Sequence, residues 1–375
     1  MRNEVVAALV IVLVIASAGA GYLVGRANER TVTSVSTLVT TSTTTLIEGT
    51  PIPIASVETG NVSIGGSPYT IAVDPSASRI YVAGGSNVLT VVDAATYAVV
   101  ATVTLPSASN GGIAIDYKTG TVYVLVEGGV ALVNGTTDTV VKELAANFGF
   151  RSIAFDSSTG ILYGSPETIS YSSPVGYLVG VDAQTGAVVA NVSIGYWASD
   201  VVVNPQLNLI YAVGCAQSFV CDSVVSVVNG TSAKVMNETT LGSLYYATAT
   251  IDEESGTVYV SGDAQLVALN PYGTVIHNSY SDTCGPFISM ADDPASNQVI
   301  MAPQNYDYVL VYDGWFGNLL NMYSLPGAPQ YVAFNPVTNE TYVIVSQSLL
   351  VFYGATSTGH VNDTQIGAGQ FCAPP

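Results

Sequence analysis

Residues that could carry out metal or acid–base chemistry are few and scattered along the chain. The only two histidines are His277 and His360, too few for a metal centre built on imidazole. The adjacent acids at positions 292–293 and 253–254 resemble calcium ligands. Neighbouring residues of a strand point to opposite faces, however, and the second pair falls in a predicted turn, so neither predicts a cation site. The motifs GxSxG and HExxH and a phosphate-binding loop are absent.

Three aspartates could supply a carboxylate to a hydrolase or a lyase. They are Asp200, Asp282 and Asp292, and their positions predict no pair for general acid–base catalysis. The sequence therefore favours a protein without catalysis and without a cofactor or metal. An extracellular hydrolase or lyase is the alternative.

The four cysteines predict disulfides. Cys215 and Cys221 flank one short segment, Cys284 lies further along, and Cys372 is near the C-terminus. None forms a CxxC pair, and an even number of cysteines in an exported chain favours disulfides over metal ligands. We expect Cys215 to pair with Cys221 and Cys284 with Cys372; four free thiols are the alternative.

Seven copies of one pattern position these residues. In each copy an apolar segment ends in Asp or Asn, a four-residue turn follows, and the residue seven positions after this anchor is Tyr, or Ile300 in the sixth copy. The anchors recur every 40 to 48 residues and are Asp74, Asp116, Asp156, Asn204, Asp252, Asp293 and Asn335. A repeat of this length with four short strands per copy is typical of a β-propeller blade.

Turn chemistry and strand composition also favour an all-β, seven-bladed propeller with four-stranded blades. The residue four positions after the anchor is Gly or Asn in six of the seven copies, and both tolerate the left-handed backbone of a hairpin turn. The residue two positions before the anchor is mostly small, as expected where inner strands converge. Apolar and polar residues alternate only weakly, which indicates sheets buried on both faces.

Ring closure has two candidate strands. Residues 61–65 copy the predicted fourth strand at 191–195 letter for letter, yet they precede the first anchor and have no blade of their own. We expect them to complete the last blade beside residues 349–352. The tail at 360–366 is the alternative.

The repeat resembles that of the YVTN-type β-propeller family over about residues 58–367. The matching stretches are residues 67–82, 112–124 and 331–343, with the Asp-Ala-x-Thr turns at Asp93 and Asp182. Family members look like archaeal surface-layer-associated proteins and bacterial exported binding proteins. The resemblance therefore implies a propeller at the cell surface.

The chain outside the repeat predicts export and attachment. Residues 1–30 contain an apolar run at 5–25, which at about 1.5 Å per residue is long enough to cross a bilayer as a helix. We expect an uncleaved transmembrane anchor; a signal peptide cleaved near residues 16–20 is the alternative. Residues 31–57 are rich in Ser and Thr and predict a stalk, and residues 58–375 would form the propeller. Both alternatives place the propeller outside the cell.

Composition excludes nucleic acid as a natural partner. Only 9% of the residues are charged, and the net charge is −19. Binding to nucleic acid requires clustered Lys and Arg, which the chain lacks.

The connections of a propeller lie on two faces. Turns between strands one and two and between strands three and four share the turn face; loops between blades and between strands two and three share the loop face. Long loops are expected on the loop face at residues 165–176, 214–222 and 304–308. Candidate binding residues there are Tyr69, Phe148, Arg151, Tyr171, Trp197, Asp200, Tyr245, Tyr246, Phe287, Tyr306 and Tyr308. Rings beside polar groups suit an envelope glycan or a surface protein, and packing between blades is the alternative for each ring.

Seven Asn-x-Ser/Thr sequons are expected away from the loop face. They lie in turns of the turn face or on outer strands, at Asn61, Asn134, Asn191, Asn229, Asn237, Asn339 and Asn362. Attached sugars would cover the rim and the turn face and leave the loop face bare. The sequence as a whole predicts a glycosylated, non-catalytic binding or envelope-structural module.

Overall fold

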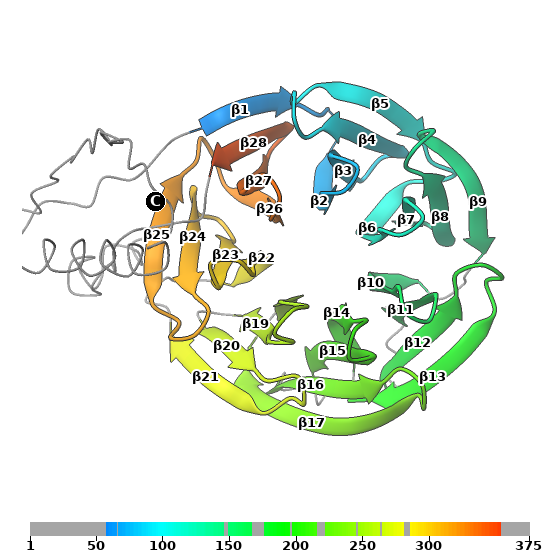
Figure 1. The fold of residues 1–375 in the computed structure, drawn as a ribbon, viewed down its shortest axis with the longest axis vertical. Helices are drawn as coiled ribbons and strands as arrows, with labels where there is room; N and C mark the ends of the chain where they lie inside the picture. Colours follow the sequence, from blue (N-terminus) through cyan, green and yellow to red (C-terminus); the bar gives the residue numbers. More distant parts are fainter. Residues whose placement is uncertain are drawn as a thin grey trace, which may run out of the picture. The chain divides into compact units, whose positions relative to one another are not determined.

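The chain folds into a ring of seven sheets. The computed structural model describes residues 58–65, 67–145, 149–166, 176–195, 197–215, 222–244, 247–262, 265–280 and 286–353. These residues form seven four-stranded sheets around a central opening (Figure 1). The predicted all-β, seven-bladed propeller with four-stranded blades is confirmed.

Each blade runs from an inner to an outer strand. The innermost strands are β2(Pro68–Asp74), β6(Ser109–Asp116), β10(Phe150–Asp156), β14(Trp197–Asn204), β18(Thr248–Ile251), β22(Phe287–Asp293) and β26(Pro329–Asn335). The second strands are β3(Arg79–Gly84), β7(Thr121–Val126), β11(Ile161–Pro166), β15(Leu209–Cys215), β19(Val258–Gly262), β23(Gln298–Pro303) and β27(Glu340–Val345). The third strands are β4(Val88–Asp93), β8(Gly129–Asn134), β12(Gly176–Asp182), β16(Asp222–Asn229), β20(Gln265–Leu269), β24(Tyr308–Asp313) and β28(Ser348–Tyr353). The outermost strands are β5(Val99–Thr104), β9(Thr139–Ala145), β13(Val188–Ile194), β17(Lys234–Ser243), β21(Val275–Tyr280), β25(Leu319–Ser324) and β1(Glu58–Ser63).

The anchor residue builds the first hairpin of its blade. In blade four, the side-chain oxygen of Asn204 accepts the backbone N–H groups of Gln206 and Leu207, each at 3.0 Å. The residue four positions after the anchor has a left-handed backbone in all seven blades, from φ 51° at Asn297 to 74° at Gly256. Short Asp and Asn side chains suit the anchor because they reach backbone donors two and three residues ahead.

The repeat tyrosine joins one blade to the next. The hydroxyl of Tyr211 in blade four donates to the carbonyl of Pro271 at 2.8 Å, in the β20–β21 turn of blade five. In blade one, the hydroxyl of Tyr81 lies so close to the next blade that a Cβ on Gly135 would be 2.5 Å from it. A small residue after the third strand therefore leaves room for this contact.

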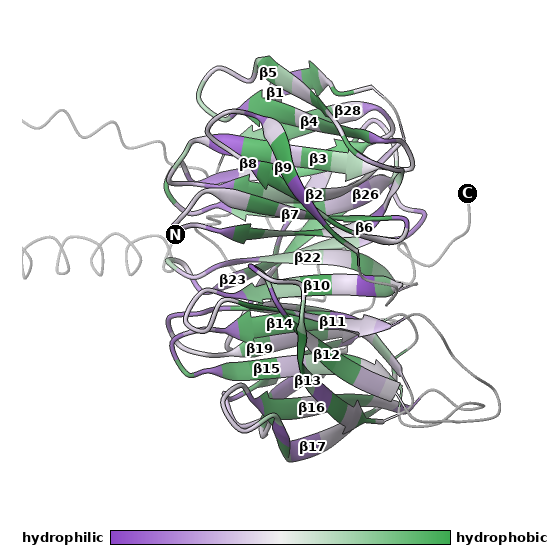
Figure 2. Ribbon diagram, turned by 90° about the vertical axis from the view of Figure 1, so that its right-hand side faces the viewer, coloured by the Kyte–Doolittle hydropathy of each residue, from purple (hydrophilic) through white to green (hydrophobic). Residues whose placement is uncertain are grey.

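Apolar packing lies between the blades. One cluster of buried apolar side chains occupies each of the seven junctions between neighbouring described blades. In side view, hydrophobic residues lie along the strands and hydrophilic residues concentrate in the turns (Figure 2). The second and third strands of each blade bury both of their faces, which accounts for the weak alternation in the sequence.

The N-terminal strand of the described chain closes the ring. β1 lies antiparallel to β28, with Val62 opposite Leu349, and completes the last blade (Figure 1). The prediction that residues 61–65 supply the closing strand is confirmed. The alternative strand at 360–366 lies outside the described residues.

The predicted anchor and stalk, residues 1–57, also lie outside the described residues and stay predictions. The described ranges contain no helix with the length and apolar character that a membrane span requires.

Candidate functional site

The innermost strands border a cavity at the loop-face end of the central opening. Its volume is about 560 Å³, and its wall includes the residue four positions before the anchor in every blade. These wall residues are Thr70, Gly112, Ser152, Asp200, Thr248, Ser289 and Tyr331. All except the glycine carry a hydroxyl or a carboxylate, so the rim of the cavity is polar.

A repeated irregularity of the inner strand shapes this rim. In β14 the pairing register shifts between Ala198 and Asp200, and in β22 it shifts between Phe287 and Ser289. The same shift occurs at the corresponding places of β2 and β26. A bulge of this kind bends a strand and turns a side chain to a new direction. The cavity is therefore built by the repeat itself rather than by a single loop.

Asp200 is the polar centre of one side of the cavity. Its carboxylate accepts the hydroxyl of Ser152 at 2.7 Å from blade three and that of Thr248 at 3.1 Å from blade five. The N–H groups of Val201 and Ala249 donate to it at 2.9 and 3.0 Å. Burial raises the pKa of Asp200, and these hydrogen bonds oppose the rise. Asp200 thus ties three blades together at the cavity wall.

Arg151 and Trp197 form a charged and aromatic edge. Arg151 lines the cavity and is exposed, and its guanidinium carbon lies 5.2 Å from the centre of the Trp197 ring. A cation–π contact at an exposed site contributes about 0.5–1 kcal/mol. The structure therefore brings three of the predicted residues, Arg151, Trp197 and Asp200, to one side of the cavity.

The remaining predicted binding residues have different positions. The rings of Tyr306 and Tyr308 lie 5.4 Å apart, and Tyr306 follows the cavity-wall residue Gln304 by two positions in the β23–β24 loop. Phe287 is fully buried between blades five and six, so its ring packs in the core and offers no surface to a ligand. The side chains that lie outside the described residues are Tyr69, Phe148, Tyr171, Tyr245 and Tyr246.

Asp292, predicted as a candidate catalytic acid but not as a binding residue, lies at the opposite end of its innermost strand from the cavity. Asp292 directly precedes the anchor of blade six, where every other copy has an apolar residue. The hydroxyl of Thr250 in blade five donates to it at 2.7 Å. Burial raises the pKa of Asp292 to about 7, and the charges of Asp252 and Glu253 act in the same direction. Comparison of the seven copies at this position singles it out among the candidate acids.

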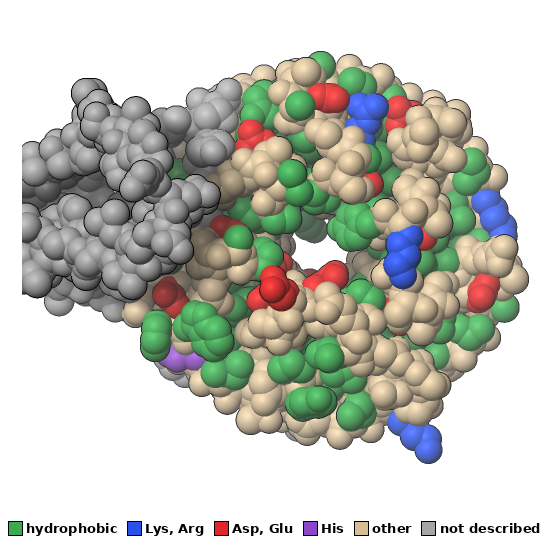
Figure 3. All heavy atoms as spheres, in the orientation of Figure 1, with side chains coloured by type: hydrophobic (Ala, Val, Ile, Leu, Met, Phe, Trp, Pro, Cys, Tyr) green, Lys and Arg blue, Asp and Glu red, His purple; other side chains and the backbone are tan. Residues whose placement is uncertain are grey.

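These carboxylates do not form a metal site. Among the described residues, no three His, Cys, Asp or Glu side chains are grouped closely enough to hold a metal ion. Figure 3 shows the turn face, with acidic side chains at the edge of the central opening.

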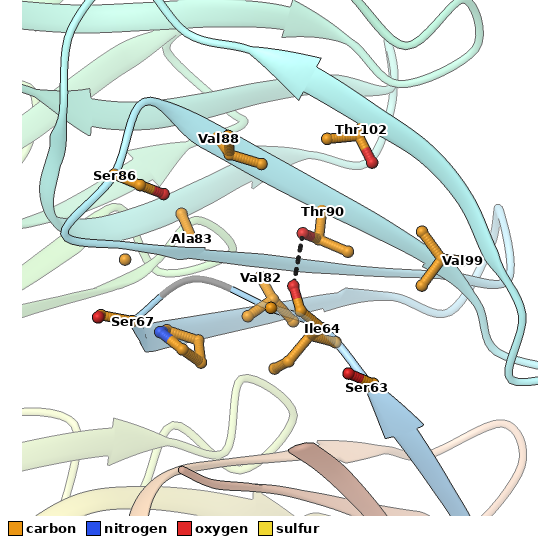
Figure 4. Close-up of a pocket in the computed structure, with 13 residues that line it drawn as sticks. Ser63, Ile64, Ser67, Val82, Ala83, Ser86, Val88, Thr90, Val99 and Thr102 are labelled. Atoms are coloured by element: carbon orange, nitrogen blue, oxygen red, sulfur yellow. Dashed lines mark hydrogen bonds between the residues drawn. The ribbon is translucent and has the colours of Figure 1, made fainter. Parts of the chain in front are cut away.

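A second cavity, of about 500 Å³, lies where β1 meets blade one. Its wall is formed by residues 63–65 and by parts of β3, β4 and β5, and the hydroxyl of Thr90 donates to the carbonyl of Ile64 at 3.3 Å (Figure 4). The described wall contains no charged side chain. This cavity is a consequence of ring closure and not a candidate site.

The described sequons lie away from the cavity. They belong to turns of the turn face at Asn134, Asn229 and Asn339 and are exposed on outermost strands at Asn61, Asn191 and Asn237. Asn362 lies outside the described residues. Attachment of sugars stays a prediction.

One cysteine lies within the described residues. Cys215, at the end of β15, is disulfide-bonded. The other three cysteines, Cys221, Cys284 and Cys372, lie outside the described residues, so the predicted pairing stays a prediction.

Comparisons with known proteins support the fold. The structure is similar to a Kuenenia stuttgartiensis hydrazine synthase chain, with a TM-score of 0.68 and 14% identity over 77% of this chain and 96% of that chain. It is also similar to the Myceliophteria thermophila Cps50 (Swd1) β-propeller domain, with a TM-score of 0.63 and 10% identity over 78% and 98% of the two chains. No family model and no curated protein matches the sequence. Likeness at such identity extends to the fold and not to function, and membership of the YVTN-type family stays a prediction.

Proposed function

We propose that the chain is an exported, membrane-tethered propeller of the YVTN type that acts at the cell surface as a non-catalytic binding module. The observation that carries this proposal is the polar cavity of about 560 Å³ at the loop face, with Arg151 and Trp197 at its edge. Ligand sites in proteins commonly have volumes of about 300–1,000 Å³. The ligand is an envelope glycan or an exposed segment of an envelope protein.

The chemistry of the edge supports such a ligand. The Trp197 ring can stack on the apolar face of a sugar or on a side chain of a peptide, and Tyr306 adds a second ring near the cavity. Arg151 adds a positive charge that attracts carboxylate groups. Sequons on the turn face and the rim would leave this side free of attached sugars.

Attachment of the purified propeller, residues 58–375 without the predicted anchor and stalk, to isolated cell envelopes tests the proposal. Trp197→Ala combined with Tyr306→Ala should reduce the attached fraction and leave the melting temperature within a few degrees of the parent. Lys118→Glu on the turn face is the matched control and should leave attachment unchanged. If Lys118→Glu abolishes attachment and the aromatic double variant does not, the wrong face has been assigned. If neither variant reduces attachment, the propeller acts as a structural spacer.

A hydrolase or lyase is the second candidate, and Asp292 is the observation that favours it. A carboxyl group with a pKa of about 7 at the central opening suits a general base near neutral pH. Product release from a panel of lactones and uronate polysaccharides should be measured with the parent and Asp292→Asn. Turnover that the variant loses would replace binding with catalysis; no turnover in either protein leaves the binding proposal standing.

A further inference from the structure

The most exposed aromatic side chains of the described chain lie on the turn face. Trp315 and Phe316, in the β24–β25 turn of blade six, are 58% and 64% exposed. Tyr272, in the β20–β21 turn of blade five, is 60% exposed. The sequence predicts aromatic rings on the loop face, so this second group is a separate surface that needs its own explanation.

The blade-six turn fixes the backbone that carries its two rings and also the indole of Trp315. The carboxylate of Asp313 accepts the backbone N–H groups of Trp315 and Phe316 at 2.8 and 2.9 Å. With the amide of Asn297 oriented so that its oxygen faces Trp315, the indole N–H donates to it at 2.7 Å. Rings that are already fixed lose little conformational freedom when a partner binds.

The charged side chains of the blades that carry these rings have one sign. No lysine or arginine follows Lys234 in the sequence, so blades five to seven carry acidic side chains without any cationic one. The exposed Glu253 and Glu254 lie in the β18–β19 turn of the same face. Figure 3 shows hydrophobic side chains across the lower half of this face, beside acidic side chains at the central opening.

We propose that the turn face of blades five and six, with Trp315, Phe316, Tyr272, Glu253 and Glu254, binds a lysine- or arginine-bearing segment of another protein. Charge complementarity carries the assignment, because a basic segment would meet carboxylates and exposed ring faces together. The contact of Arg151 with Trp197 shows the same type of pairing within this chain. A second copy of the chain, with a net charge of −19, would be repelled.

The chain contains a natural pair of reporters for this proposal. Its only two tryptophans are Trp197 beside the loop-face cavity and Trp315 on the turn face. Trp197→Phe leaves Trp315 as the sole indole, and Trp315→Phe leaves Trp197. Tryptophan fluorescence of the full chain should be titrated with a synthetic peptide of alternating arginine and glycine and, as control, with one of alternating glutamate and glycine.

The arginine peptide should change the fluorescence of Trp197→Phe and leave that of Trp315→Phe unchanged. Glu253→Gln with Glu254→Gln should weaken the response of Trp197→Phe by roughly fivefold, and raised salt should weaken it further. A salt-independent response would overturn the basic partner in favour of a neutral or apolar one. A response to the glutamate peptide would show that the charge of the peptide does not decide binding, which would also overturn the proposal. A response seen only from Trp197, or from neither indole, would overturn binding at the turn face of blades five and six. The loop-face proposal is tested separately, by envelope attachment.

Discussion

Asp292 shows how one residue of a repeat changes the electrostatics of the ring. The position before the anchor faces the preceding blade, and in the other copies it carries Val, Ile or Phe. At blade six the aspartate meets Thr250 instead, and burial makes its charged form unfavourable. The junction of blades five and six therefore gains a polar contact at a position that is apolar in the other six copies.

We predict that Asp292→Asn stabilises the protein increasingly as pH rises from about 4 to about 7. The pKa of Asp292 rises from 3.8 to about 7 on folding, so between these values the folded chain binds more protons than the unfolded chain. Stability contributed by the protonated carboxyl is thus fully present below about pH 4 and is lost as pH rises from there to about 7, whereas an amide stays neutral and can still accept from Thr250.

Melting curves should be recorded at about pH 3, below the unfolded pKa of Asp292, and at about pH 8.5. The variant should match the parent at the lower pH and melt a few degrees higher at the upper pH. A variant that melts lower than the parent at the upper pH would show that the charged carboxylate is favourable in the fold.

The elements of the blade differ in how far the sequence predicts them. Anchors such as Asn204, and left-handed residues such as Asn297, follow from local chemistry, because an Asx turn uses only neighbouring backbone groups. The direction of Phe287 does not follow, because a bulge in β22 changes which face its neighbours take. The cavity depends on that same bulge, so the sequence indicates the loop face but not the polar rim around it.

The tyrosine contact between blades predicts a modest loss of stability in Tyr211→Phe. Removing the hydroxyl leaves the Pro271 carbonyl without its donor at 2.8 Å, which should lower the free energy of unfolding by about 1 kcal/mol. Urea unfolding measures the change, with Tyr177→Phe at an exposed position as the control. Equal effects of the two changes would mean that the contact with blade five does not contribute.

Peptide mapping without reduction should find Cys215 joined to Cys221 and Cys284 joined to Cys372. The first bridge closes a short loop between β15 and β16, and its removal by Cys221→Ser should lower the free energy of unfolding by about 2 kcal/mol. A different partner for Cys215 would refute the pairing.

At the scale of the whole molecule, two features come from residues far apart in sequence. β1 and β28 join the two ends of the described chain. This pairing is predictable because residues 61–65 have the sequence of a fourth strand but precede the first blade. The two faces differ in chemistry, with a polar cavity on the loop face and exposed rings with acids on the turn face. Composition alone does not reveal this division, since it depends on which turn each residue occupies.

Ring closure predicts that substitutions at adjacent residues of β1 differ sharply in their effect on the free energy of unfolding. Val62 is buried against blade one, whereas Ser63 is exposed. Val62→Asp should lower the free energy of unfolding by about 3 kcal/mol or more, because it buries a charge without a partner. Ser63→Asp should have little effect in the same urea titration. Equal tolerance of both changes would indicate that β1 is not needed to close the ring.

Photo-crosslinking in intact envelopes tests the central claim of a loop-face binding module most directly. A photoreactive amino acid would replace Tyr306 on the loop face in one full-length chain and Lys118 on the turn face in another. Our account predicts a discrete crosslinked envelope component from position 306 and none from position 118. A crosslink from position 118 alone, or from neither position while the chain stays attached, would contradict binding through the loop face.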